Sequence, residues 1–403
     1  MRTLTNTVRD LVAPSISSDG QRVLFTTGRN QFPFTASNTD PGPGQPIEAD
    51  GLYLWEGDTG HTEYITERYA TNPVPETAVY TGMQTDNQPR MSQDGRFVAF
   101  SSGVRQLLIG GSSVNLDRMN VIVRDRVGRT NIVPSFLVGD GLQTIAYTLV
   151  NGLSDDGQHL LFERRMALES DAYSAPQASY LPHLWLLRPA DGQVMCVSSN
   201  ALLNELGNSG SSHGTISADG NWIAYFSRAS NLVAGDNNNL HDVFLHDRVN
   251  GTNLRISTHP AWQGVRGGRV EQAPRLTPDG RFVLYQASGS GLFRYDRVTG
   301  TNALITADVE TDTPDLSADG RFVVFTARPS SIDPADPNPH RQVYCHDFVT
   351  GLTELISVRD PAVPAATSND ASVLELAAVS ATGRFIAFTS RASDLDPVGG
   401  GQL

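Results

Sequence analysis

The sequence predicts an all-β chain of 403 residues that folds as one seven-bladed β-propeller with four-stranded antiparallel blades. Three observations support this fold class. A pattern of an apolar residue, Ser or Thr, any residue, usually Asp, and then Gly recurs seven times, each time before an apolar strand. The segments between the copies contain short strand-like runs and tight turns, without a helical stretch that has convincing caps. Repeats of about 40 to 60 residues built only of strands and turns are typical of a propeller, so residues 1–403 are expected to form a single domain.

The seven copies of the pattern are found at residues 16–20, 91–95, 153–157, 216–220, 276–280, 316–320 and 379–383. Asp and Gly are suited to tight hairpin turns, because Gly adopts positive φ freely and Asp hydrogen-bonds the backbone of its own turn. We therefore interpret the Asp of each copy as a turn residue rather than a functional residue.

The fifth repeat is the shortest and shows the plan of one blade. Its four strands, called A to D in chain order, are expected at residues 273–277, 282–285, 292–296 and 302–306. The strands carry apolar residues at successive positions because both faces of each sheet pack against neighbouring blades. Gly280 and Gly300 supply the turns from A to B and from C to D.

Other repeats carry the same motifs, such as Ser-Ala-Asp-Gly-Arg at 317–321 and Asp-Val-Phe-Leu-His-Asp-Arg at 242–248. In these motifs the chain resembles the TolB-like, or WD40-like, propeller repeats. The resemblance covers nearly the whole chain and implies a propeller fold. It does not define an activity, because such repeats serve as binding rings, protease gates and enzymes.

Closure of the ring is expected to involve both termini. The last repeat supplies strand A and a strand B at 384–388, and the sequence ends at Leu403, where strand C would begin. Residues 4–10 resemble the strand D segment at 355–360. We therefore expect the N-terminal strand, residues 3–9, to complete the seventh blade and cover its open edge. Either this blade has three strands or the chain is truncated.

Loop length differs between the two ends of the predicted blades. From the turn Gly to the end of strand C the fifth repeat uses 16 residues, Gly280 to Asp296, whereas the first uses 36, Gly20 to Glu56. The connections from B to C and from D to the next A lengthen, while the A–B and C–D hairpins stay short. Both long connections lie at the same face of an up-and-down blade, and long loops on a rigid scaffold usually carry function.

Composition excludes several partners and chemistries. The net charge is −13, with 43 acidic and 30 basic residues, which argues against nucleic-acid binding and against an anionic membrane surface. No apolar run approaches the ~20 residues of a membrane span, and the first residues lack a signal-peptide core. We expect a soluble monomer, cytoplasmic as the sequence stands, or periplasmic or secreted if a signal peptide has been removed. All basic residues are Arg, so chemistry that needs a lysine is excluded.

The repeat explains several conspicuous residues. His246 and His346 occupy a strand C position that Arg or Tyr occupies in other repeats, so we interpret them as blade-frame residues. Residues 210–214, Gly-Ser-Ser-His-Gly, match a nucleophile elbow, but a strand rather than a helix is expected to follow them. Cys196 and Cys345 belong to repeats on nearly opposite sides of the ring, too far apart for a disulfide.

One loop segment has the character of a cation site. Asp236, Asn238 and Asp242 present oxygen atoms at alternating positions, as calcium loops do. The segment lacks the central Gly and terminal Glu of an EF-hand. A turn rich in Asn and Asp explains the same pattern without a metal. The sequence therefore requires no cofactor, and Ca²⁺ is the alternative.

The remaining candidates are polar and aromatic residues of the long loops that the repeat does not require. In the richest segment Trp262 would supply a stacking surface, Arg266 and Arg269 bidentate donors, and Glu271 an acceptor for an anionic or sugar-like ligand. The other ligand-binding candidates are Tyr80, Asn87 and Asp370, and the candidate catalytic residues are Arg68, Tyr69, His213, His259 and Arg359.

Two functions remain open from the sequence. The first is a recognition ring that binds a glycan, a peptide or another small polar ligand on the loop-rich face. The second is an enzyme of the lyase, hydrolase or cyclase type, with its active site at the channel mouth on the same face. An enzyme requires His, Tyr, Arg and carboxylate groups within hydrogen-bond reach of one another, whereas binding alone predicts a flatter aromatic rim.

Overall fold

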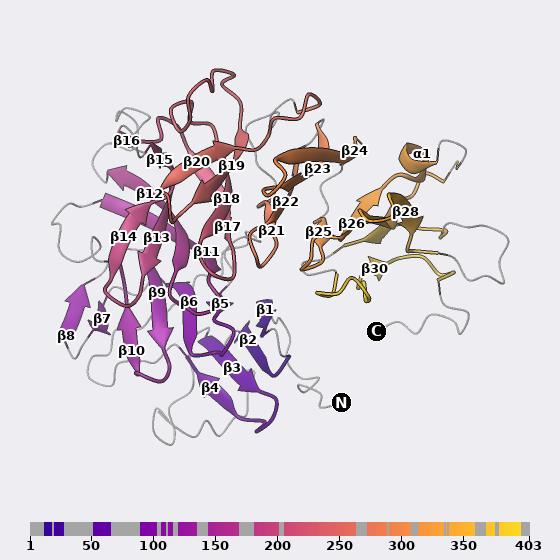
Figure 1. The fold of residues 1–403 in the computed structure, drawn as a ribbon. Helices are drawn as coiled ribbons and strands as arrows, with labels where there is room; N and C mark the ends of the chain where they lie inside the picture. Colours follow the sequence, from indigo (N-terminus) through magenta and orange to yellow (C-terminus); the bar gives the residue numbers. More distant parts are fainter. Residues whose placement is uncertain are drawn as a thin grey trace. The chain divides into compact units, whose positions relative to one another are not determined.

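The structure is a computed structural model, and it divides into two compact units, Met1–Gly220 and Asn221–Leu403. It describes residues 12–17, 20–27, 51–65, 89–102, 106–109, 112–115, 120–134, 144–168, 181–200, 205–262, 272–287, 290–307, 313–333, 336, 338–358, 368–374 and 379–395. Figure 1 shows that these residues form almost exclusively strands and turns, which confirms the all-β prediction.

The first unit contains three four-stranded antiparallel sheets and two additional hairpins among its described residues. The first sheet is formed by β1 (Val12–Ile16), β2 (Arg22–Thr27), β3 (Gly51–Glu56) and β4 (Thr62–Tyr64). The second is formed by β5 (Arg90–Met91), β6 (Phe97–Ser102), β9 (Asn120–Asp125) and β10 (Thr130–Ile132), with the hairpin β7 (Gln106–Ile109) and β8 (Ser112–Asn115) inserted between β6 and β9. The third is formed by β11 (Thr144–Leu153), β12 (Leu160–Leu168), β13 (His183–Arg188) and β14 (Gln193–Cys196). The hairpin β15 (Ser199–Asn200) and β16 (Glu205–Leu206) and strand β17 (Ser211–Ile216) end the unit.

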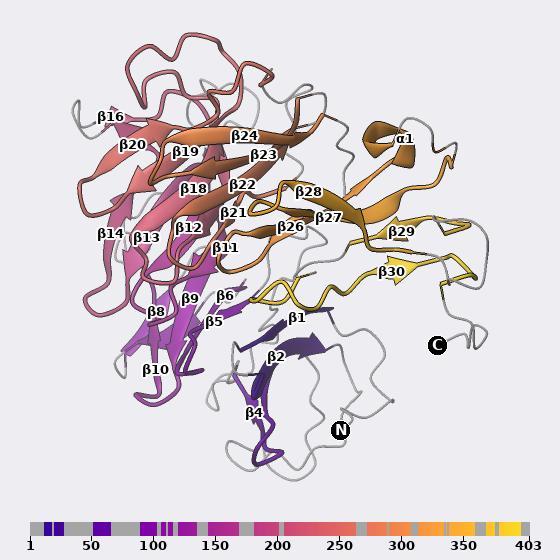
Figure 2. The same cartoon turned by 45° about the vertical axis from the view of Figure 1, so that its right-hand side comes forward.

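The second unit repeats the same plan. It begins with the paired strands β18 (Trp222–Ser227), β19 (Asp242–Asp247) and β20 (Thr252–Arg255). The next sheet contains β21 (Arg275–Leu276), β22 (Phe282–Ala287), β23 (Gly291–Asp296) and β24 (Thr301–Thr306). It is followed by β25 (Asp315–Leu316), β26 (Phe322–Ala327), β27 (Gln342–Asp347) and β28 (Leu352–Leu355), and by the pair β29 (Ser372–Val373) and β30 (Thr389–Ser390). Figure 2 shows β29 and β30 next to β27 and β28.

In these four-stranded sheets the strands lie in chain order, which is the up-and-down arrangement of a propeller blade. The structure thus confirms the predicted fold class and places the strands of the fifth repeat within two residues of their expected bounds. The one described helix, α1 (Pro329–Ile332), was not predicted, and its single turn begins with Pro, whose fixed φ favours a helix start. Residues 3–9, which are expected to close the ring, lie outside the described residues, so the seven-bladed closed ring stays a prediction.

The recurrent turn is held by side chains, which explains why its sequence repeats. In the second repeat Ser92 donates a hydrogen bond of 2.6 Å to Asp94 and accepts the Phe97 backbone N–H at 2.9 Å. Arg96 then pairs with both carboxylate oxygens of Asp125 on β9, at 3.0 and 2.7 Å. This pairing holds the pKa of Asp125 below its usual value. The Asp of the turn is therefore structural, as the sequence predicted, and the Asp of strand C is structural as well.

The turn Gly has a second role in packing one repeat against the next. Gly320 has a φ of 68°, and a Cβ added there would collide with the ring of Phe282, two residues after the preceding turn Gly280. The same relation joins Gly157 to Phe97 in the first unit and Gly280 to Trp222 in the second. In these three cases the successive sheets therefore stack through an aromatic ring that lies on the next turn, whereas Gly95 of the second repeat meets the side chain of Arg22.

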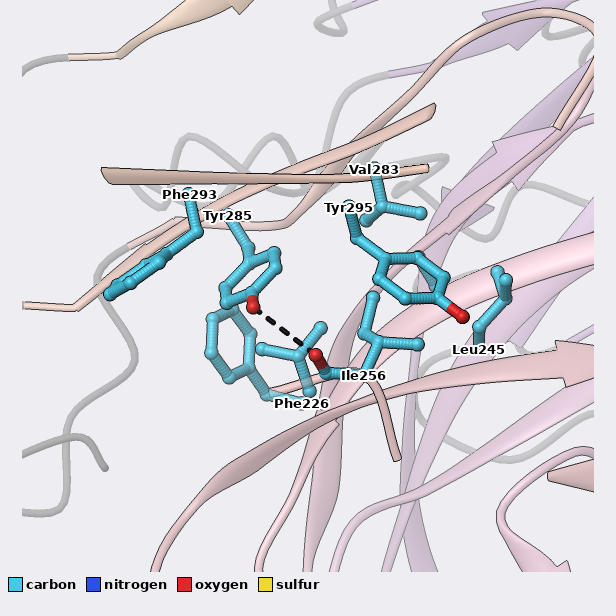
Figure 3. Close-up of a cluster of buried hydrophobic side chains, with 9 residues drawn as sticks. Phe226, Leu245, Ile256, Val283, Tyr285, Phe293 and Tyr295 are labelled. Carbon is cyan, nitrogen blue, oxygen red and sulfur yellow. Dashed lines mark hydrogen bonds between the residues drawn. The ribbon is translucent and has the colours of Figure 1, made fainter. Parts of the chain in front are cut away.

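The core is a series of clusters between successive sheets rather than one central mass. One cluster packs Leu24, Leu52 and Leu54 of the first sheet against Val98 and Ile122 of the second. In the second unit a cluster between β18–β20 and β21–β24 includes Phe226, Leu245, Ile256, Val283, Tyr285, Phe293 and Tyr295 (Figure 3). This last cluster supports the loops described next.

Candidate functional site

The long loops of one repeat meet at the end of the blade opposite the Asp-Gly turns. In the fourth repeat the B–C loop carries Asp236 and Asn238 and leads into β19. The D–A loop follows β20 and carries His259 and Trp262. The two loops are joined by a hydrogen bond from the Trp262 indole Nε1 to the Asp242 carboxylate, at 3.0 Å. The predicted placement of both loop types at one face is thus seen within this repeat.

Asp242 lies at the centre of this cluster and is fully buried. Its Oδ1 accepts hydrogen bonds from the Ser257 hydroxyl at 2.6 Å and from Trp262. Its Oδ2 accepts a hydrogen bond from the Asn238 amide nitrogen at 2.7 Å. The desolvation of this carboxylate is offset by three donors, because a buried charge is tolerated only when it is hydrogen-bonded or paired.

Arg255 supplies the positive charge of the cluster. Its guanidinium NH1 lies 3.1 Å from Asp236 Oδ1 and 3.6 Å from Asp242 Oδ2. Burial and the nearby charge of Asp242 raise the pKa of Asp236, and Arg255 opposes that shift. One guanidinium thus bridges two carboxylates that come from a loop and a strand.

The predicted cation ligands are brought together, and in this structure they hydrogen-bond to one another and to neighbouring groups. Asn238 faces Asp242 with its amide N–H group, and its oxygen accepts the Leu240 backbone N–H at 2.8 Å. The Asp242 oxygens already accept hydrogen bonds from Ser257 and Trp262. Across the described residues no group of three or more His, Cys, Asp or Glu side chains is arranged to hold a metal ion.

Trp262 and His259 are held by the aromatic core of the fifth repeat. The Trp262 ring lies edge-on to Tyr285 and Phe293, with centroid distances of 5.4 and 5.8 Å, and the His259 ring lies 5.3 Å from Phe293. Figure 3 shows Tyr285 donating its hydroxyl hydrogen bond to the Ile256 carbonyl, at 3.2 Å. These contacts hold Trp262, and with it the start of the D–A loop, against the aromatic core.

The sixth repeat uses Gln342 where the fourth uses Asp242. Gln342 is fully buried, and its Oε1 accepts hydrogen bonds of 2.7 Å from both Ser357 and Ser368. Its Nε2 donates to the carbonyls of Ser368 and Asp370, at 3.4 and 3.3 Å. Asn338 of the B–C loop donates to the Ser368 carbonyl at 2.8 Å. A neutral amide thus joins the two loops here.

The first residue of strand C is therefore an anchor position that the repeat pattern did not reveal. It is His183 in the third repeat, Asp242 in the fourth and Gln342 in the sixth, and each contacts a Ser fifteen residues later. That Ser also accepts the backbone N–H of the next residue of strand C, at 3.0 to 3.1 Å. The sequence signal for this position is a polar residue followed fifteen residues later by Ser. It is hard to recognise because the polar residue is His, Asp or Gln in different repeats.

Two other predicted residues are described. His213 on β17 has a φ of 57°, a left-handed conformation that is unfavourable for a non-glycine residue, and its Nδ1 lies 2.8 Å from the Ser212 hydroxyl. Asp370 lies in the D–A loop of the sixth repeat, where its Oδ1 accepts the Ala371 backbone N–H at 2.6 Å. The other predicted site residues lie outside the described residues: Arg68, Tyr69, Tyr80, Asn87, Arg266, Arg269, Glu271 and Arg359.

The residues that the sequence assigned to the frame have structural surroundings. His246 is buried with its Nδ1 3.1 Å from Asn253 Oδ1, and burial lowers its pKa. Residues 210–214 lead into β17 rather than a helix. Cys196 and Cys345 are free thiols, and burial raises the pKa of each to about 11.

Comparison with known proteins places the chain among propeller structures at low identity. No family model and no curated protein matches the sequence. An oligogalacturonate lyase in complex with manganese is 14% identical, with 85% of this chain and 75% of the lyase aligned and a TM-score of 0.46. TolB from Acinetobacter baumannii is 15% identical over 83% of this chain and 63% of TolB, with a TM-score of 0.37. A β-propeller domain from Myceliophteria thermophila is 12% identical over 87% of each chain, with a TM-score of 0.40. In the described residues no helix is long and apolar enough to cross a membrane. TolB and a β-propeller domain are thus among the proteins that this chain resembles, as its repeat motif predicts.

Proposed function

We propose that this chain is a ligand-recognition propeller whose loop-rich side binds a small polar ligand such as a glycan or a peptide. The observation that carries the proposal is the anchor at the start of strand C. In the fourth and sixth repeats a buried polar side chain ties the B–C loop and the D–A loop of the same blade together.

Such anchors fix the loops before a ligand arrives. A flexible loop loses conformational freedom on binding, and that loss opposes association, so a loop that is already ordered binds more tightly. The anchoring groups of the fourth repeat, Asp242 and Trp262, are engaged with one another. Ligand contacts would therefore come from residues further along the loops, such as Arg266 and Arg269. Trp262 would stabilise the start of the loop that carries them.

The proposal is tested by binding on glycan and peptide arrays with the full chain and with Arg266→Ala and Arg269→Ala. We expect one of these variants to weaken binding about 10- to 100-fold, since a guanidinium paired with an anionic or polar group contributes strongly to recognition. Val298→Ala is the control, because Val298 is exposed on the C–D turn at the opposite end of its blade. Binding that no loop substitution alters would refute the proposal.

One observation favours an enzyme as the second candidate. His213 is held in a left-handed backbone conformation with its Nδ1 beside the Ser212 hydroxyl, and backbone strain of this kind is concentrated at functional sites. Mass spectrometry of any ligand found on the arrays, after incubation with the protein, separates the two functions. Conversion that His213→Gln abolishes would establish catalysis, whereas an unchanged ligand supports binding alone.

A further inference from the structure

His340 and Asp370 form a second feature of the loop-rich side, on the sixth repeat. His340 comes from the B–C loop that leads into β27, and Asp370 comes from the D–A loop that leads into β29. The imidazole Nδ1 lies 3.7 Å from the carboxylate Oδ1. Both side chains are nearly half exposed, at 43% and 45%. An acidic and a basic group from two loops are thus presented together to solvent.

The backbone on both sides of this pair is fixed by buried groups. The backbone N–H of His340 donates to Asn338 Oδ1 at 2.9 Å, and Asn338 in turn donates to the Ser368 carbonyl. Gln342 Nε2 donates to the Asp370 carbonyl at 3.3 Å. Asp370 Oδ1 accepts the Ala371 N–H, so the carboxylate is also oriented. These contacts fix the backbone of both residues and one carboxylate oxygen of Asp370.

The pair does not belong to the repeat frame. The fourth repeat carries Leu240 at the place of His340, where it is 37% exposed. In that repeat the Asn238 amide donates to Asp242 rather than to a carbonyl of the D–A loop. The blade therefore forms without a His–Asp pair at this position, and the pair is available for another role.

We infer that His340 and Asp370 form a binding site for a cationic N–H donor, such as the guanidinium of an arginine-containing peptide. The Asp370 carboxylate offers two acceptor oxygens to the parallel N–H donors of a guanidinium, and the His340 ring lies beside it. The chain has 43 acidic and 30 basic residues, and its net charge of −13 favours a cationic partner over an anionic one at long range. This inference rests on the proposed recognition function and names the ligand chemistry of one part of the same side.

The test uses two labelled peptides of equal length, one with three arginines and one with three citrullines, which keep the shape of arginine but carry no charge. Fluorescence anisotropy with the full chain should give a dissociation constant about 5-fold or more lower for the arginine peptide, in the range of an exposed bidentate ion pair. Free arginine amide, added as a competitor, distinguishes recognition of the guanidinium alone from recognition within a peptide. If arginine amide displaces the labelled peptide at concentrations similar to those of the unlabelled arginine peptide, the protein recognises the guanidinium alone.

Asp370→Asn should remove the preference for arginine, because Asn keeps the hydrogen bond to Ala371 but loses the charge. His340→Leu, which copies Leu240 of the fourth repeat, should reduce it. Glu354→Gln on β28 is the matched control, since it removes one exposed carboxylate of the same unit away from these loops. Equal affinity for the two peptides, or an equal loss in Glu354→Gln, overturns the inference. If the arginine preference is absent while Arg266 or Arg269 variants still lose array binding, the inference fails and the proposed function stands.

Discussion

Replacement of Asp242 tests the anchor directly through the stability of the fold. Asp242→Ala leaves the Ser257 hydroxyl, the Trp262 indole N–H and the Asn238 amide without their acceptor. It also removes one of the two carboxylates beside Arg255. The loss of a buried, hydrogen-bonded charge costs about 3 to 5 kcal/mol. We therefore expect the free energy of unfolding to fall by about that amount.

Asp242→Asn separates the charge from the shape of the side chain. The amide oxygen can still accept from Ser257 and Trp262, but the amide nitrogen would face the Asn238 N–H group. Rotation of Asn238 would relieve that clash only by breaking its hydrogen bond from Leu240, 2.8 Å long. One unsatisfied buried polar group costs about 1 to 3 kcal/mol, so this variant should lie between the wild type and Asp242→Ala.

Urea unfolding followed by far-ultraviolet circular dichroism measures these differences, and Glu354→Ala on exposed β28 is the control for a lost carboxylate. The control should change the free energy of unfolding by less than about 0.5 kcal/mol, as surface substitutions do. The reasoning is refuted if Asp242→Ala unfolds within that margin of the wild type, or if Asp242→Asn is the more damaging of the two.

Three further predictions follow from the described residues. Arg129 has a φ of 51° in a C–D turn where the later repeats place Gly with φ near 70°. Arg129→Gly should therefore raise the free energy of unfolding by about 0.5 to 1 kcal/mol in urea titrations. A loss of stability in this variant would contradict the strain argument. Burial lowers the pKa of His246 and His346 from the usual 6.5, so the unfolded chain binds protons that the folded chain does not. Stability should be full above pH 6.5 and fall as the pH drops from 6.5 toward the lowered pKa values. A urea midpoint that does not change between pH 7.5 and 5 in the wild type, or the same acid loss in His246→Gln, would argue against this. Burial raises the pKa of Cys196 and Cys345 to about 11, so an aromatic disulfide reagent at pH 8 should label both slowly in the folded protein and rapidly in urea; rapid labelling without urea would show that the thiols are accessible.

The repeated pattern predicted the blade well because each of its positions has one physical task. Ser92, Asp94 and Gly95 satisfy the backbone of a single turn, and the turn chemistry is the same wherever that hairpin occurs. The bounds of the strands in the fifth repeat followed from this alone. The helix α1 was missed because four residues give too short a window for a helical period.

The loop-rich side was predictable only in part. The sequence placed Asp236, Asn238 and Asp242 in one group, and the structure brings them together. It could not show that Trp262, twenty residues beyond Asp242, donates to that carboxylate, because a contact across two loops leaves no periodic signal. His340 escaped notice for the same reason, since its partner Asp370 is thirty residues away.

The fourth and sixth repeats reach the same loop anchor with different chemistry. Asp242 is a charged acceptor that can only accept, so its neighbours are donors, including the guanidinium of Arg255 on β20. Gln342 both accepts and donates, and the position of Arg255 is Leu355 in that repeat, because no buried charge requires neutralisation there. The difference decides what each anchor can hold. An acceptor-only carboxylate recruits side-chain donors such as the Trp262 indole, whereas the amide of Gln342 recruits backbone carbonyls of the D–A loop and leaves Asp370 oriented toward solvent. The choice between a carboxylate and an amide at one buried position thus sets which side chains the loops can offer to a ligand.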